Sequence, residues 1–303
     1  MGLNPPQPTE WGTTAERWIS RARIFGWATL VSNIALVVTG GAVRLTGSGL
    51  GCPTWPRCTE ESFAPHGALS VHQAIEFGNR TLTFVLTAIA VATLVSAWLT
   101  RRRDLRRIAI LLALGIPAQA IIGGIVVLTD LNPWLVSFHL LCSGLIIAGA
   151  VVFLVRIDHP GRWQAGRWTT LVALTYATLW SVIYVGTVVT GSGPHAGDAD
   201  ARRNGLDPLQ LSQLHADGVF LLLGLTVALL LIARNDHAGA ADLQGPVRIL
   251  LVTELLQGVL GFVQYFTGLP EIVVGAHLFG AAVLVAVGTW VLVASLRKSP
   301  VPG

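Results

Sequence analysis

The stretch VHQAIEFGNRTLTFVLTAIAVATLVSAWLT, Val71 to Thr100, joins a polar opening to a long apolar run. From residue 81 onward it is almost wholly apolar, and a helix of this length crosses a bilayer. In the opening part, His72, Glu76 and Arg80 recur at every fourth position, so they lie along one face of a helix. Ionisable groups beside hydrocarbon are costly and usually face a bundle interior, where they serve a site. The stretch therefore predicts a membrane helix with functional side chains at one end.

The composition extends this interpretation to the whole chain. Hydrophobic residues make up 52% of the 303 residues, charged residues 12%, and the mean hydropathy is +0.64, which excludes an ordinary soluble domain. The net charge of +4 comes from loop arginines and does not indicate a nucleic-acid partner. We expect an all-α, polytopic membrane protein with eight transmembrane helices, over residues 24–43, 72–100, 107–128, 133–155, 168–190, 210–233, 247–268 and 272–296.

Arginines gather in alternate loops, and the positive-inside rule makes these loops cytoplasmic. Examples are Arg21, Arg102, Arg156, Arg234 and Arg297. We therefore predict a multi-pass protein of the plasma membrane with both termini in the cytoplasm. The outer face then carries a long first loop at 45–71 and a polar loop at 191–210.

The two halves of the sequence repeat each other. The first apolar window ends in TGGAVRLTGSG from Thr39, and the fifth ends in VGTVVTGSG from Val185. The third and seventh carry QAIIGGIVVLTDL from Gln119 and QGVLGFVQYFTGL from Gln257. Because each unit has four helices, we expect two tandem four-helix bundles related by a pseudo-twofold axis along the membrane normal. The chain divides into a tail at 1–23, an N-terminal half at 24–156, a linker at 157–167, a C-terminal half at 168–296 and a tail at 297–303.

The repeat arranges four histidines into two pairs, His72 with His139 and His215 with His277. Counted from the cytoplasmic helix ends, three of them lie roughly 26 to 30 Å along the axis, whereas His72 lies roughly 42 Å along it. Its helix must therefore tilt strongly or project past the membrane. Paired histidines on facing helices are typical of heme iron held by two imidazoles, whereas zinc requires three or four ligands. The alternative is that each histidine only hydrogen-bonds between helices. His195, in the outer loop GSGPHAGD, is a weaker candidate for contact with a cofactor edge.

Several motifs together resemble the heme A synthase family. They are TGSGLGCPTWPRC after the first helix, HQAIEFGNR opening the second, TGSGPHAGD after the fifth, and single histidines in helices 4, 6 and 8. The resemblance covers about residues 24 to 296. It implies an eight-helix membrane enzyme that converts heme O to heme A by oxidising the C8 methyl to a formyl group, for aa3-type terminal oxidases.

The resemblance also assigns roles to the histidine pairs. It implies that His215 and His277 bind a resident heme b, and that His72 and His139 hold the substrate heme. If both axial positions of the substrate iron are histidines, oxygen cannot bind there without ligand loss. Water is then the expected source of the formyl oxygen, with electrons leaving through heme b.

Glu76 matches the glutamate that the family needs for activity. The residue four after His215 is Val219, so only the first half carries a carboxylate at this place. A carboxylate near the heme edge accepts a proton, orients water or stabilises positive charge. The alternative for Glu76 is an ion pair with Arg80 one turn on.

Further residues of the outer face complete the predicted site. Arg80 and Arg44 lie where heme propionates would point, or else they extend to the interface. Cys52 and Cys58 flank PTWPR on the outer side, where disulfides persist, and we predict that they pair and pin the first loop over the N-terminal site.

Two other classes of protein fit part of the pattern. A di-heme b-type, quinone-linked electron-transfer cytochrome uses the same histidines but gives Glu76 no role. A transporter explains the duplication but usually has broken helices and polar sites at the midplane. The favoured interpretation implies heme O, a heme O synthase, an electron acceptor and the bilayer as partners, with the heme sites toward the outer face. A homo-oligomer is compatible with it.

Overall fold

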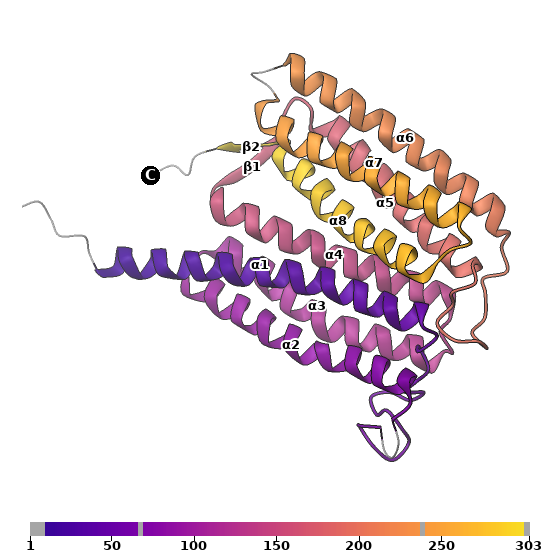
Figure 1. The fold of residues 1–303 in the computed structure, drawn as a ribbon. Helices are drawn as coiled ribbons and strands as arrows, with labels where there is room; N and C mark the ends of the chain where they lie inside the picture. Colours follow the sequence, from indigo (N-terminus) through magenta and orange to yellow (C-terminus); the bar gives the residue numbers. More distant parts are fainter. Residues whose placement is uncertain (1–9, 66–68, 237–239, 300–303) are drawn as a thin grey trace, which may run out of the picture.

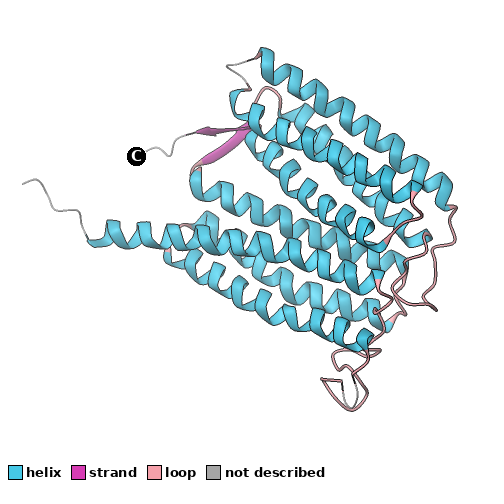
Figure 2. Ribbon diagram, viewed as in Figure 1, coloured by secondary structure: helices cyan, strands magenta, loops and turns pink. Residues whose placement is uncertain are grey.

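The computed structural model describes residues 10–65, 69–236 and 240–299. Within them, eight long helices are each apolar enough to cross a membrane (Figure 2), which confirms the predicted fold class. They are α1 (Glu10–Leu45), α2 (Val71–Leu99), α3 (Arg103–Leu128), α4 (Pro133–Asp158), α5 (Thr169–Ser192), α6 (Pro208–Asn235), α7 (Gln244–Phe266) and α8 (Glu271–Ala294). A 3₁₀ turn at Ala241–Leu243 and two short strands, β1 (Arg162–Ala165) and β2 (Leu296–Ser299), complete the described elements.

Local sequence signals fix the outer ends of α2, α4 and α6. Ser70 caps α2 in a capping box with Gln73, whose side chain accepts from the Ser70 backbone N–H. Asn132 and Asp207 cap α4 and α6, and a proline follows each of them at the first helical position. At the other end of the molecule α1 is longer than its apolar window, because it begins at Glu10 within the segment expected to be a tail.

Each half forms a ring of four helices. In the first half α1 and α3 both pack against α2 and α4, so α2 and α4 stand at opposite corners. In the second half α5 and α7 pack in the same way against α6 and α8. The rings meet through α1 with α8, α4 with α5 and α4 with α8 (Figure 1). If α1 is exchanged with α5 and α4 with α8, the same three contacts result, as a twofold relation requires. The axis itself stays a prediction.

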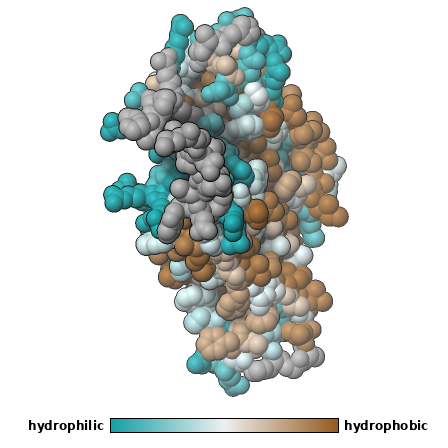
Figure 3. All heavy atoms as spheres, turned by 90° about the vertical axis from the view of Figure 1, so that its left-hand side faces the viewer, coloured by the Kyte–Doolittle hydropathy of each residue, from teal (hydrophilic) through white to brown (hydrophobic). Residues whose placement is uncertain are grey.

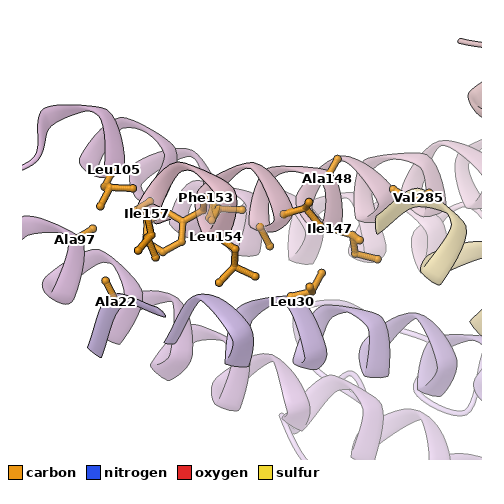
Figure 4. Packing of buried hydrophobic residues seen from close by; sticks show 14 of the residues in the cluster. Ala22, Leu30, Ala97, Leu105, Ile147, Ala148, Phe153, Leu154, Ile157 and Val285 are labelled. Atoms are coloured by element: carbon orange, nitrogen blue, oxygen red, sulfur yellow. The ribbon is translucent and has the colours of Figure 1, made fainter. Parts of the chain in front are cut away.

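The largest buried cluster lies where α4 meets its neighbours (Figure 4). Phe153 of α4 is fully buried, and around it lie Leu30 of α1, Leu105 of α3 and Val285 of α8. In a bilayer such packing stabilises the bundle through van der Waals contacts, since lipid tails are as apolar as these side chains. Many large apolar side chains elsewhere are exposed, among them Phe84, Leu111, Phe220, Leu256 and Phe279. Such a surface suits hydrocarbon, because helices satisfy their own backbone groups in lipid.

The start of α1 and the end of α8 lie at the same end of the molecule (Figure 1). Figure 3 looks onto this end, where hydrophilic side chains gather, while hydrophobic ones lie along its flanks. Asp104 binds Arg102 at 2.7 Å and Arg156 at 2.9 Å here, which ties α3 to α4. The strands pair antiparallel at this end and join residues 162–165 to 296–299. The sequence did not predict this ribbon, because four-residue charged segments carry no strand periodicity.

Candidate functional site

Three of the four candidate histidines pack against a glycine of the preceding helix. A side chain on the glycine would crowd the rings of His215 and His139 and would make ordinary contact with that of His277. A Cβ built at Gly186 would lie 3.0 Å from Cε1 of His215. A Cβ at Gly123 would lie 3.3 Å from Cε1 of His139, and a Cβ at Gly261 would lie 3.5 Å from Cε1 of His277.

Two glutamines hold the turns that carry His139 and His277. Gln119 Nε2 donates to the His139 carbonyl at 3.3 Å, and Gln257 Nε2 donates to the His277 carbonyl at 2.6 Å. The sequence repeat therefore recurs as equivalent hydrogen bonds. Neither glutamine was predicted to belong to the site, although both lie 20 residues before their histidine.

The ring nitrogens of the same histidines are available to a ligand. Nδ1 of His139 and Nδ1 of His277 are buried and have no hydrogen-bond partner among the described residues. An unpaired buried nitrogen is costly, so a partner outside the polypeptide is expected. His215 Nδ1 lies 3.0 Å from the Val182 carbonyl, which leaves its Nε2 for a metal. His215 and His277 also lie close enough to interact electrostatically. These donors fit a heme between opposite corners of the second ring.

The described residues contain no group of three or more histidine, cysteine or acidic side chains that could hold a metal ion. A site built from this part of the chain therefore offers protein ligands in smaller sets. Two imidazoles per iron are sufficient for a heme, whose macrocycle supplies the other four donors.

His72 is not at the depth of the other three histidines. It is the second residue of α2, it is exposed, and its Nδ1 lies 3.0 Å from Ser48 Oγ in the preceding loop. It stands 27 residues before the end of its helix, against 20 for His215, 19 for His139 and 17 for His277. The predicted pairing of His72 with His139 therefore lacks geometric support.

Loop length explains why the repeat suggested that pairing. The segment from Thr46 to the first residue of α2 spans 25 residues, whereas that from Thr190 to the first residue of α6 spans 18. The first loop is longer, but His72 lies at the start of its helix, whereas His215 lies seven residues within its helix. These two differences cancel, so the number of residues from each threonine to its histidine is nearly equal.

Glu76 is buried and forms the ion pair that was the alternative to a catalytic role. Its Oε1 accepts from Arg80 Nη2 at 2.5 Å and from Nε at 3.1 Å, and its Oε2 accepts from the Cys52 backbone N–H at 2.6 Å. Arg80 also donates to the carbonyls of Cys52 (2.6 Å), Thr54 (2.9 Å) and Arg57 (3.2 Å). Every nitrogen of this guanidinium is engaged, so Arg80 holds the outer loop and has little capacity left for a propionate.

The disulfide between Cys52 and Cys58 is present, as predicted, and both residues are fully buried. Trp55, between them, lies against Gly124 of α3, where a Cβ would overlap the indole. Gly124 follows the glycine that receives His139. The disulfide loop therefore closes over the outer end of the first ring, between α2 and α3.

Arg44 and His195 join the two halves on the outer side. Arg44 donates from Nε to the His195 carbonyl at 2.6 Å and from Nη2 to the Thr190 carbonyl at 2.9 Å. His195 Nε2 in turn lies 2.9 Å from the Leu269 carbonyl, in the turn between α7 and α8. The Arg44 side chain thus links the end of α1 to the second half, and the His195 side chain links two loops within that half.

The sequence model of a family described as cytochrome oxidase assembly protein matches residues 23–199, more than half of the chain. The chain belongs to this family. The region matched by this cytochrome oxidase assembly family begins within α1 and includes α2 to α5 with the disulfide loop. It therefore includes Glu76, Arg80 and His139.

Individual relatives extend beyond that region. A protein from Halalkalibacterium halodurans named Heme A synthase is 26% identical over 277 residues, which are 86% of this chain and 89% of that protein. A Heme A synthase from Listeria welshimeri is 24% identical over 91% of this chain and 96% of its own length. A Thermus thermophilus protein named Protoheme IX farnesyltransferase is 27% identical over 93% of this chain, but the match spans only 40% of that longer protein.

Proposed function

We propose that this protein is a heme A synthase, which converts heme O to heme A by oxidising the C8 methyl to a formyl group. Relatives of that name align with both rings. The observation that carries the proposal is an asymmetry between similar halves. Each ring has a glycine-backed imidazole on its last helix and a buried carboxylate, but the two carboxylates differ in place. Glu76 of the first ring is held at the outer end of α2 beneath the disulfide loop, whereas Glu254 of the second ring lies on α7 and accepts from Thr226 Oγ1.

In the second ring, His215 and His277 would hold a heme b as the resident cofactor. The fixed Nδ1 of His215 and the unpaired Nδ1 of His277 support this assignment. When bound, this heme supplies a one-electron carrier. Gln257 and the Val182 carbonyl orient the two imidazoles, and the glycines beside them keep the rings from being displaced.

The first ring holds heme O as substrate, with His139 as an iron ligand. Loss of electrons and a proton from one methyl carbon develops positive charge there, which a fixed carboxylate stabilises. Glu76 is suited to this role because Arg80 and the Cys52 N–H hold its two oxygens in fixed positions. The loop closed by Cys52 and Cys58 excludes bulk water from the outer end of the ring.

The expectation that water supplies the formyl oxygen rested on two axial imidazoles at the substrate heme. The position of His72 does not support a second one, so that argument falls away. Water stays the proposed oxygen source: conversion of the methyl group with one water to a formyl group releases four electrons and four protons. The electrons released would pass to an acceptor outside the chain, and a heme held by His215 and His277 would supply one-electron chemistry for this.

We further propose that heme O arrives directly from the enzyme that makes it. The Thermus relative named Protoheme IX farnesyltransferase combines a segment similar to this chain with a longer remainder. Such an arrangement in one polypeptide supports handover of substrate within the membrane.

The termini lie on the cytoplasmic side and the heme sites toward the outer face, in agreement with the arginines at the end where α1 begins.

The test is extraction and chromatography of heme from cells that express the chain and have a supply of heme O. Wild type should yield formyl heme, and Glu76→Ala should retain heme O without converting it. Arg57→Gln is the matched control, because only the backbone carbonyl of Arg57 contacts Arg80. Two permanent b hemes with no formyl or hydroxymethyl product would instead favour the di-heme electron-transfer cytochrome.

A further inference from the structure

The buried faces of α2 and α6 establish how the two halves correspond in space. Toward the cytoplasmic end, Leu86, Ala90, Thr93 and Ala97 of α2 are buried, as are Leu222, Thr226, Leu229 and Ala233 of α6, and α2 buries Ser96 in addition. Each α6 residue lies 136 residues after its α2 counterpart, and the helix ends, Leu99 and Asn235, keep the same spacing. Four buried positions and one helix end therefore give a single register.

In this register the counterpart of His215 is Asn79. The contacts of the two side chains agree with this, since each reaches the preceding helix at the same level. Asn79 Oδ1 accepts from Thr39 Oγ1 at 2.8 Å, and His215 Nδ1 lies 3.0 Å from the Val182 carbonyl. When TGSG at Thr46 is aligned with TGSG at Thr190, Thr39 and Val182 fall within one residue of each other.

The space for an imidazole is also reduced in the first ring. Gly186 receives the His215 ring, and in the same TGSG alignment its counterpart is Ala42. His72 lies seven residues before Asn79, on the same helix face but about 10 Å further out. It is also engaged with Ser48 in the outer loop.

We propose that the iron of the substrate heme is held by one imidazole, that of His139, and that its opposite axial position, faced by Asn79, is open to a small ligand. This rests on the proposed function, because it concerns the heme O of the first ring. A carboxamide is a weak ligand for heme iron, and the oxygen of this one is already engaged by Thr39. The two hemes then differ in ligation as well as in chemistry, with a closed second site and a first site open on one side.

Carbon monoxide is the probe, added to purified, reduced, heme-loaded protein and followed by the change in the Soret and visible bands. We expect one of the two hemes to bind carbon monoxide, and the ferric form of that heme to be high-spin by electron paramagnetic resonance. The double variant Ala42→Gly/Asn79→His recreates the arrangement at His215 and should abolish binding and give a low-spin heme. His72→Ala should leave binding unchanged.

Heme extracted from the same samples separates the two proposals. Protein that contains heme O or heme A but binds carbon monoxide at neither heme, and gains binding in His72→Ala, would overturn the open position and make His72 the second ligand. Protein that contains neither heme O nor heme A would overturn the proposed function itself. The wild-type and His72→Ala measurements decide the matter even where the double variant does not fold.

Discussion

Arg80 Nη2 lies 2.5 Å from Glu76 Oε1, one helical turn away, and both side chains extend from this pair to the backbone of the disulfide loop. The ion pair and the catalytic role, which are alternatives in the sequence, are therefore compatible. Arg80 orients the carboxylate and also closes the loop over it. Removal of either partner should affect both the loop and the chemistry.

Replacement of Arg80 by Gln should lower formation of formyl heme by about tenfold or more. The change leaves Glu76 without its cationic partner in a buried setting, where breaking such a pair costs about 3–5 kcal/mol. Product per protein and the thermal midpoint of unfolding measure the two effects. Arg57→Gln should change neither, and equal loss in that control would show that the outer loop tolerates no substitution.

Loss of the disulfide should affect the first ring alone. Replacement of Cys52 and Cys58 by serine should cost about 2 kcal/mol of stability for so short a loop, and it should loosen Trp55 from Gly124. We expect faster proteolysis in the loop and less product, with an unchanged spectrum of the heme b. Cys142→Ala, at the free cysteine, is the control. A parallel loss of heme b would contradict the separation of the two rings.

Alanine at the glycines beside the histidines should have graded effects. A Cβ at Gly186 meets the His215 ring at 3.0 Å, whereas one at Gly261 meets the His277 ring at an ordinary 3.5 Å. Gly186→Ala should therefore lower heme b content several-fold, and Gly261→Ala should lower it little. Gly258→Ala is the control, since no described atom outside its own helix backbone lies within 4 Å of a Cβ there. Pyridine hemochrome assays provide the measurement, and equal effects at all three glycines would contradict the expected order.

The two glutamines should act on different hemes. Gln257→Leu removes the 2.6 Å hydrogen bond to the His277 carbonyl and should weaken heme b retention by about fivefold, the equivalent of about 1 kcal/mol. Gln119→Leu should weaken retention of the substrate heme instead. Extracted heme composition distinguishes the two variants. If both lowered the same heme, the correspondence between the halves would be wrong.

The helices and the disulfide could be predicted because they depend on local sequence. Apolar windows of sufficient length place the eight helices to within a few residues, except at the start of α1, where a largely polar extension has no apolar signal. Cys52 and Cys58 are close in sequence and lie on the outer side, so their pairing needed no tertiary information.

The histidine pairing could not be settled in this way, because sequence spacing combines loop and helix lengths. The first outer loop has seven extra residues, so His72 and His215 lie at nearly the same sequence distance from the TGSG motif of their half. In its helix, however, His72 lies two turns closer to the outer end than His215 does. The backbone contacts of Arg80 and Arg44 were also beyond prediction, since carbonyl acceptors carry no side-chain signal. Gln119 and Gln257 had a signal in their equal spacing to a histidine, but no chemistry that singled them out.

The most direct test of two distinct heme sites is the heme composition of purified His139→Ala and His277→Ala proteins, each produced with and without a supply of heme O. We predict that His139→Ala keeps heme b and loses heme O and heme A, whereas His277→Ala loses heme b. Wild type should contain heme b in both cultures, and heme O or heme A only when heme O is supplied. Wild-type protein that carries two b hemes and never heme O or heme A would contradict the account.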